Sequence, residues 1–342
     1  MRLRRSDPSG PGIRRIRSGR GVWYVDQNGN PVRDADTLAR ISALAVPPAW
    51  TDVWISAWPH GHIQATGTDA LGRRQYRYHD EWRRQRDAAK HDRVLDLAAR
   101  LPGARRRTSA ALRGAELTRE RVLAGCFRLL DAGSIRIGGE VYAEAHETFG
   151  LATIRRDHVT VTGDRVDLAY LGKAGKAQSS CLRDASLARL VGELLARDDE
   201  NPELFGWREG EGWHDVRSAD VNSYLRDLLA GEVSAKDFRT WNATVLMAQR
   251  LAFCTDPDAS LTARRRAVNT CLREVADYLG NTPAVAKASY VDPRVVDLFH
   301  DGCVVPTPVL PRRAAHLPIH PQVERAVLRM LLPPAVGRRR AA

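Results

Sequence analysis

The chain has 342 residues, of which 43% are hydrophobic, enough to fill the cores of two ordinary domains. Lysine and arginine outnumber the acidic residues and give a net charge of +12, which favours a polyanionic partner without choosing among DNA, RNA and a membrane surface. No apolar run approaches the roughly 20 residues that cross a bilayer, and no apolar stretch follows the charged residues at the start, so we expect neither a membrane span nor a signal peptide.

Residues 1–85 have the turn signals and the short alternating runs of a β-rich domain. Asn28 and Gly29 form a typical hairpin turn. The runs that predict strands lie at 21–25, 53–56, 62–67 and 73–78. The charged segment 81–87 follows, and we interpret it as the link to a second domain.

Residues 90–302 are predicted to form a second, mostly helical domain, because their apolar residues recur with a helical period. Thr118 can cap one helix, and Gly280 is placed as the stop of another. Helices are expected from near 92 to 101 and over 118–130, 218–229, 235–254, 260–279 and 293–299. Two strands, 158–162 and 166–171, interrupt them. The basic, Pro/Arg-rich tail 303–342 is expected to be loosely ordered apart from a short helix near 323–332.

Cysteine and histidine give no sign of a metal site. The five cysteines are odd in number and widely spaced, and no two form a C-x-x-C pair, which favours reduced thiols in a cytoplasm over disulfides or zinc ligands. The ten histidines are scattered without an H-E-x-x-H motif. A Walker-type phosphate loop is also absent from the sequence. We therefore expect no metal, no nucleotide and no other cofactor.

Five side chains have the chemistry that a phosphodiester transesterification needs: a nucleophile, cations for the phosphate charge and an acid for the leaving oxygen. Tyr290 can attack, but a tyrosine at its usual pKa is a poor nucleophile and needs a strong positive field. Arg136 and Arg239 can supply that field without losing a proton. Lys173, at a turn after a strand, can donate a proton, and Asn281 can donate a hydrogen bond to a phosphate oxygen.

Each of these residues also has an ordinary structural interpretation. Arg136 can cap a helix or form a salt bridge, and Lys173 can be a solvated turn lysine. Tyr290 can be a half-buried packing residue. Asn281, which follows Gly280, can simply terminate a helix. Taken singly, none of the five is specific.

Short motifs in a fixed order distinguish the chain from these ordinary cases. They lie at 46–50, 61–67, 72–78, 135–138, 147–153, 171–173, 236–240, 280–283 and 289–290. Over most of residues 12–302, this series resembles the type IB DNA topoisomerases, in particular the small poxvirus and bacterial branch. The resemblance identifies duplex DNA as the expected substrate.

The resemblance implies a role for each of the five residues. Tyr290 matches the nucleophile that takes the 3′-phosphate. Arg136 and Arg239 match the arginines that bind the non-bridging oxygens, and Lys173 matches the general acid for the 5′-oxygen. Asn281 departs from the poxvirus pattern, which has histidine there; an asparagine can donate one hydrogen bond but carries neither charge nor a transferable proton.

The resemblance also implies DNA-binding residues. Tyr142 matches a phosphate-contacting tyrosine of the family. Gly139 replaces a DNA-contacting poxvirus lysine, and Ala174 replaces an aspartate, which puts a shared sequence preference in doubt. The strand that poxvirus enzymes lay in the major groove is matched by Arg73, Gln75, Tyr76 and Tyr78.

We therefore predict an α+β protein, with a β-rich N-terminal domain and a helical catalytic domain of the topoisomerase IB/tyrosine recombinase type. It would close around DNA as a C-shaped clamp. It would relax supercoiled DNA as a monomer, without ATP or metal, in the cytoplasm and on the nucleoid if it is bacterial.

Two alternatives remain at this stage. A tyrosine recombinase shares the catalytic module, but it usually has histidine where this chain has Lys236, and its first domain is usually helical. The second alternative is a non-catalytic DNA-binding protein of the same fold, against which the complete catalytic set argues.

Overall fold

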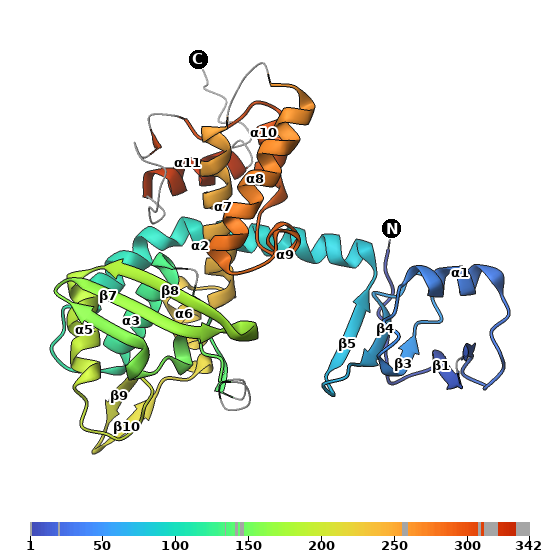
Figure 1. Cartoon of the computed structure of the whole chain (residues 1–342), viewed down its shortest axis with the longest axis horizontal. Helices are drawn as coiled ribbons and strands as arrows, with labels where there is room; N and C mark the ends of the chain where they lie inside the picture. The colour runs from blue at the N-terminus through green and yellow to red at the C-terminus, as the bar shows by residue number, and fades with distance from the viewer. Residues whose placement is uncertain are drawn as a thin grey trace, which may run out of the picture. The chain divides into compact units, whose positions relative to one another are not determined.

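The structure is a computed structural model, shown in Figure 1, that forms two compact units, residues 1–90 and 91–342. Each unit is considered by itself. The division falls within helix α2 (Asp80–Ala111), which therefore contributes residues to both units. The described residues are 2–19, 21–133, 135–140, 143, 147–254, 259–306, 309–310 and 321–332.

The first unit is built on an antiparallel sheet with the strand order β2-β1-β3-β4-β5. Its strands are β1 (Ile13–Ser18), β2 (Gly21–Val25), β3 (Thr51–Ile55), β4 (Ile63–Thr68) and β5 (Arg74–Tyr78). Helix α1 (Ala35–Ala43) begins after Asp34, whose side chain accepts a hydrogen bond from the backbone nitrogen of Thr37. The small core contains Ile13, Ile41, Trp50, Val53, Ile55 and Ala65.

The second unit combines a helical bundle with a three-stranded sheet and a separate β-hairpin. The sheet has the order β6-β7-β8, with β6 (Val159–Thr162), β7 (Arg165–Gly172) and β8 (Lys176–Arg183). The hairpin pairs β9 (Gly206–Glu209) with β10 (Gly212–Asp215). The helices are α3 (Arg119–Ala132), α5 (Ala185–Leu195), α6 (Ser218–Leu229), α7 (Ala235–Phe253), α8 (Leu261–Leu279), α9 (Pro283–Ser289), α10 (Pro293–His300) and α11 (Pro321–Leu331).

Helix α7 lies at the centre of the bundle. Most of its side chains are buried, including the apolar Phe238, Trp241 and Met247, and its buried polar residues include Asp237 and Arg239. It packs against α3, α6, α8, α10 and α11, and Figure 1 shows α7 and α8 side by side. The position of α7 therefore depends on most of the helices around it.

The predicted fold class is confirmed: a β-rich first part is followed by a mostly helical part. Strands were also predicted close to β2, β4 and β5, and helices close to α6 and α8. The strand β1 was missed because its sequence does not alternate; Ile13 is buried, whereas three of the four residues that follow it are arginines. Helix α5 was missed although Leu187, Leu190 and Leu194 have a readable helical spacing.

Two segments differ in character from what the sequence suggested. Residues 81–87, interpreted as a link, form the first turns of α2. Within the tail, α11 packs against α7, and its Val323 and Val327 are fully buried. The tail thus contributes part of the core of the second unit.

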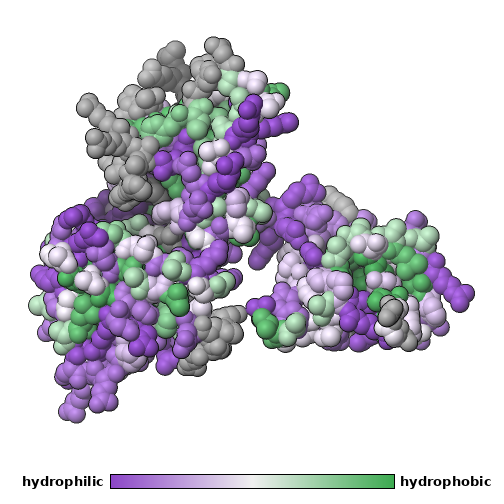
Figure 2. All heavy atoms as spheres, in the orientation of Figure 1, coloured by the Kyte–Doolittle hydropathy of each residue, from purple (hydrophilic) through white to green (hydrophobic). Residues whose placement is uncertain are grey.

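Figure 2 shows a face on which hydrophilic residues predominate and hydrophobic residues gather in patches. Among the described residues, none of the helices is both long enough and apolar enough to cross a membrane.

Candidate active site

Arg136 lies in the segment that follows α3, and a close backbone contact fixes its position. The carbonyl oxygen of Arg136 accepts a hydrogen bond from the backbone nitrogen of Leu151, at 2.8 Å. A β-carbon at Gly150 would lie 2.7 Å from that same carbonyl oxygen and 2.4 Å from the nitrogen of Gly138. Only glycine at position 150 lets these two backbone segments come so close. The motifs at 135–138 and 147–153 are therefore in direct contact.

The side chain of Arg136 reaches the end of α8. Its Nη2 donates to Oδ1 of Asn281 at 2.9 Å and lies 3.3 Å from the carbonyl oxygens of Leu279 and Gly280. Residues separated by 145 positions in the sequence are thus in direct contact.

Helix α8 ends through its backbone, without help from the Asn281 side chain. Gly280 has the left-handed conformation, with φ of 62°, which glycine adopts without strain. The backbone nitrogen of Asn281 then donates to the carbonyl oxygen of Ala276 at 2.9 Å, which closes the helix. The side-chain oxygen accepts from Arg136, while the side-chain nitrogen is buried and has no hydrogen-bond partner among the described residues. A buried amide donor of this kind is suited to an incoming anion.

Arg239 is held near the start of α7. Asp237 accepts hydrogen bonds from the backbone nitrogen and hydroxyl of Ser234, both at 2.9 Å, and from Arg93 at 3.0 Å. Arg239 itself is only 3% exposed, and its Nη2 donates to the carbonyl oxygen of Leu279 at 2.8 Å. The start of α7 is therefore anchored on both sides of the arginine.

The two arginines repel each other electrostatically. Burial, and after it the positive charge of Arg136, lowers the pKa of the Arg239 guanidinium. Arginine nevertheless stays protonated in a protein. Placing the two guanidinium groups close together therefore costs free energy, because two like charges repel each other. An anion placed between the guanidinium groups would relieve that repulsion, and a phosphate would accept hydrogen bonds from both.

Tyr290 lies at the end of α9, half-buried beside Arg239. The hydroxyl of Thr244 donates to its carbonyl oxygen at 3.3 Å, which holds the backbone. The guanidinium carbon of Arg239 lies 5.3 Å from the ring centroid of Tyr290, so this cation stands beside the tyrosine ring. Arg136, Arg239, Asn281 and Tyr290, all predicted as site residues, are therefore brought together.

The surroundings of Tyr290 favour its ionised form. Burial raises its pKa, but Arg239, Lys236 and Arg136 together lower it further than burial raises it, so the pKa lies below the ordinary 10.0. A tyrosine with a lowered pKa, beside two guanidinium groups and a free amide donor, is equipped to attack a phosphodiester.

The sequence interpretation did not include Lys236 in the site. Its Nζ lies 6.0 Å from the ring centroid of Tyr290. Lys236 precedes Arg239 by three residues on α7, and residues with this spacing share one face of a helix. That spacing was the signal that could have found it.

Lys173 lies apart from the other four predicted residues. It is exposed at the tip of the β7–β8 hairpin, where Ala174 and Gly175 both have a positive φ. The body of this hairpin lies close to the site. Gln178 of β8 is a neighbour of Gly280: a β-carbon added to Gly280 would lie 3.3 Å from the Gln178 amide. The structure thus places the lysine on a projection beside the site and does not bring it into contact with Tyr290.

Four of the predicted DNA-binding residues lie in the first unit: Gln75, Tyr76 and Tyr78 on β5, and Arg73 directly before it. The rings of Tyr76 and Tyr78 stack at 6.0 Å between centroids, and both are partly exposed. Arg73 forms a salt bridge with Asp69 at 2.8 Å, and the amide nitrogen of Gln75 donates to the same carboxylate at 2.9 Å. Two of the four residues are therefore engaged with Asp69.

Tyr142, the fifth predicted DNA-binding residue, lies outside the described residues. Within the part of the chain that is described, no three His, Cys, Asp or Glu side chains gather as a metal site would require.

Two family profiles match the chain. Residues 79–297 match "Eukaryotic DNA topoisomerase I, catalytic core", and residues 21–69 match "Bacterial DNA topoisomerase IB, N-terminal domain". The first match contains all five predicted catalytic residues. The segment 73–78 falls between the two matches.

Known viral proteins are similar over most of the chain. The DNA topoisomerase 1B of Acanthamoeba polyphaga mimivirus is 28% identical over 307 residues, which cover 85% of this chain and 88% of the relative. The DNA topoisomerase I of Monkeypox virus and the DNA topoisomerase 1B of Vaccinia virus (strain Copenhagen) are each 22% identical over 292 residues, which cover 82% of this chain and 88% of each relative.

The lowered pKa of Tyr290 predicts an early step in a tyrosine titration. In a spectrophotometric titration at alkaline pH, the difference between the wild-type protein and Tyr290→Phe should show one tyrosine that ionises below pH 10. Lys236→Met removes a positive charge and should move this step to higher pH. Lys176→Met, at an exposed lysine of the β7–β8 hairpin, should leave it in place. If the Tyr290 step does not respond to Lys236→Met, Lys236 does not act on the tyrosine.

Proposed function

Because the chain belongs to the type IB DNA topoisomerases, isomerases that act on duplex DNA, we propose that it relaxes supercoiled DNA by cutting and resealing one strand through Tyr290. One observation carries this proposal most directly. Arg136 and Arg239 converge on the carbonyl oxygen of Leu279, and the guanidinium carbon of Arg239 lies 5.3 Å from the ring centroid of Tyr290. A nucleophile and two phosphate-binding cations thus meet at one point.

In the proposed cleavage step, Tyr290 first loses its proton to water, and the tyrosinate oxygen then attacks the scissile phosphorus and forms the new bond to it. The guanidinium groups of Arg136 and Arg239 bind the non-bridging oxygens, and the free amide nitrogen of Asn281 donates a further hydrogen bond. The bond from phosphorus to the 5′-oxygen breaks, and Lys173 gives that oxygen its proton. The products are a 3′-phosphotyrosyl bond and a free 5′-hydroxyl.

Resealing is the reverse reaction. After the downstream duplex has rotated, the 5′-hydroxyl returns its proton and attacks the phosphotyrosyl phosphorus, and Tyr290 leaves. The covalent bond to the enzyme conserves the energy of the broken phosphodiester, so the cycle needs no ATP. The guanidinium groups of Arg136 and Arg239 supply the positive charge for the phosphate, so we propose that it needs no metal ion either.

We further propose how the chain grips DNA. Residues Arg73, Gln75, Tyr76 and Tyr78 of the first unit would enter the major groove, and Tyr142 of the second unit would contact a phosphate. The two units would then close around the duplex as a clamp. We also propose that the chain acts as a monomer.

The first test of the function is plasmid relaxation with EDTA present and ATP absent. The wild-type protein should relax a supercoiled circle and give a covalent protein–DNA adduct after denaturation. Tyr290→Phe removes only the attacking oxygen, so it should bind DNA normally but form no adduct. Tyr224→Phe, at a buried tyrosine of α6, is the matched control and should form the adduct. An adduct from Tyr290→Phe would overturn the assignment, and strand exchange between two DNA sites would identify a recombinase instead.

The second test separates the acid from the charge-stabilising cations. Lys173→Ala should slow cleavage of ordinary DNA strongly, because the 5′-oxygen leaves unprotonated. A 5′-bridging sulfur leaves readily as thiolate and should restore most of the rate. Arg136→Ala should not be rescued, since a lost oxyanion contact costs about 2.7–4 kcal/mol whatever the leaving group. Lys176→Ala, on the same hairpin, should cleave both substrates normally. Equal rescue of the Lys173 and Arg136 variants would exclude Lys173 as the acid.

The third test concerns Asn281. Asn281→Ala should slow single-turnover cleavage by roughly 10- to 150-fold, the value of a hydrogen bond to a charged group. Its melting temperature should change little, because the backbone closes α8. Gly280→Ala is the contrasting variant: a non-glycine residue in the left-handed conformation costs about 1–2 kcal/mol, so it should lower the melting temperature. Asn281→His should stay active. An unchanged cleavage rate for Asn281→Ala would remove this residue from the site.

A further inference from the structure

The C-terminal helix α11 buries a carboxylate. Val323, Val327 and Leu331 face the core of the second unit, and Glu324 is only 6% exposed beside them. An ionised side chain in such a place is stable only with charged or hydrogen-bonding partners.

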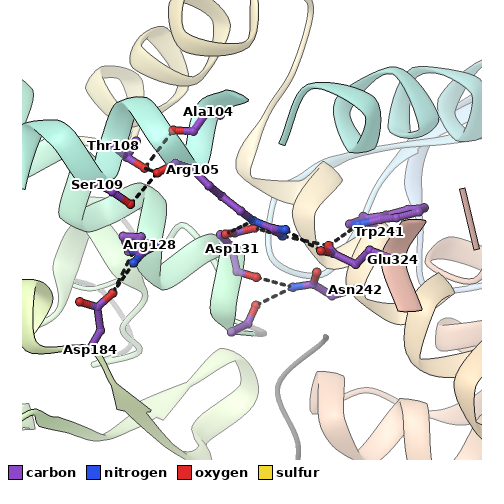
Figure 3. A network of polar contacts seen from close by, with 11 residues as sticks. Ala104, Arg105, Thr108, Ser109, Arg128, Asp131, Asp184, Trp241, Asn242 and Glu324 are labelled. Atoms are coloured by element: carbon purple, nitrogen blue, oxygen red, sulfur yellow. Dashed lines mark hydrogen bonds and ion pairs between the residues drawn. The ribbon is translucent and has the colours of Figure 1, made fainter. Parts of the chain in front are cut away.

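Glu324 has partners on two other helices, as Figure 3 shows. Arg105 of α2 donates to both of its carboxylate oxygens, at 2.6 and 2.9 Å. The indole nitrogen of Trp241 on α7 donates to Oε1 at 2.8 Å. Arg105 uses its remaining donors for Asp131 at the end of α3, with two hydrogen bonds of 2.8 Å. One guanidinium therefore joins two carboxylates.

Two of these partners are close in sequence to the two arginines of the site. Trp241 follows Arg239 by two residues on α7, and Asp131 precedes Arg136 by five residues. Asn242, next to Trp241, donates to the carbonyl oxygen of Gly133 at 3.1 Å, and Gly133 lies between Asp131 and Arg136. The network thus ties α7 to the segment that carries Arg136.

Stability alone does not account for this arrangement. One guanidinium between two carboxylates leaves an excess negative charge, and burial raises the pKa of Asp131 above its ordinary value. Replacing buried ion pairs by apolar residues of similar volume is often neutral or stabilising. An ionic network does, however, fix distances and angles more narrowly than apolar packing, because each bond has a preferred geometry.

We propose that Glu324 is a positioning residue: through Trp241, and through Arg105 with Asp131, it sets the spacing between Arg239 and Arg136. This inference rests on the proposed role of the two arginines in binding the scissile phosphate. It makes α11, which lies beyond the matched catalytic core at 79–297, a support of the active site. A displacement of about 1 Å at a reacting group can slow a reaction by roughly 100-fold.

The test is a single-turnover cleavage assay at saturating DNA, below the melting temperature of every variant. Glu324→Gln keeps the shape of the side chain and removes its charge. It should slow cleavage by roughly 10- to 100-fold while DNA affinity stays the same. Trp241→Phe removes the indole donor together with part of the buried ring, keeps Glu324 paired with Arg105, and should give a loss of the same kind; it also tests the proposal if Glu324→Gln folds poorly.

The matched control is Glu193→Gln. Arg121, at the start of α3 and ten residues before Asp131, donates from Nη2 to Oε1 of Glu193 in α5 at 2.9 Å. This variant makes the same glutamate-to-glutamine change in an ion pair of the same unit that has no contact with Arg105, Asp131 or Glu324, and it should cleave at the wild-type rate. If Glu193→Gln is as slow as Glu324→Gln, loss of any ion pair suffices and Glu324 has no special role.

A double-substitution comparison distinguishes positioning from general damage. If Glu324 acts through Arg239, then Glu324→Gln should cause no further loss in a protein that already carries Arg239→Ala. A merely structural defect would slow both backgrounds by the same factor, and that result would overturn the proposal. The proposed function is judged separately: if Arg239→Ala alone leaves cleavage unchanged, the function fails, whereas a slow Arg239→Ala with a normal Glu324→Gln rejects only the role of Glu324.

Discussion

The carbonyl oxygen of Leu279, at the end of α8, accepts hydrogen bonds from both arginines of the site, 3.3 Å from Arg136 and 2.8 Å from Arg239. The carbonyl end of a helix carries a partial negative charge, which offsets part of the repulsion between the guanidinium groups in the absence of DNA. Gly280 makes this contact possible, because its left-handed conformation ends α8 and leaves the last carbonyl groups exposed to the arginines. The positive field around Tyr290 depends on this one helix end.

The same contact prepares the site for an anion. Neutral carbonyl oxygens are weaker acceptors than a phosphate, whose charge-assisted hydrogen bonds are roughly twice as strong. The guanidinium groups that donate to these carbonyl oxygens can therefore donate to a phosphodiester instead at little cost in free energy. The free amide nitrogen of Asn281 adds a donor that the DNA-free protein leaves without a partner among its described residues. Preorganised donors of this kind need no rearrangement at the moment of reaction.

The sequence predicted much of the site, but not its geometry. Tyr290, Arg136, Arg239 and Asn281 were found from motifs, and the structure brings them together. Periodicity cannot show that Arg136 touches Asn281, because such a contact depends on how separate elements pack. Lys236 was overlooked, although its spacing from Arg239 was readable.

The tail shows a different limit of sequence interpretation. Glu324 lies in the one part of the tail, near 323–332, for which the sequence predicts a short helix, and α11 forms there; what the sequence did not predict is that this helix packs into the core and buries a carboxylate. Its burial follows from partners on α2 and α7 that are far away in the sequence. The buried glutamate is stable only because side chains from α2 and α7 pair with it. A pattern within α11 alone cannot predict these partners.

The position of Lys173 fits the role proposed for it. A fourth cation inside the cluster would add to the repulsion that Arg136 and Arg239 already experience, and like charges close together disfavour the charged form of an amine. A general acid must reach the leaving oxygen with its proton still bound. An exposed hairpin tip leaves the ammonium group in water, while the contact between Gln178 and Gly280 keeps the hairpin beside the site. Electrostatics therefore accounts for the proposed roles. The permanently charged arginines lie together at the end of α8. The lysine that is proposed to give up a proton lies apart from them.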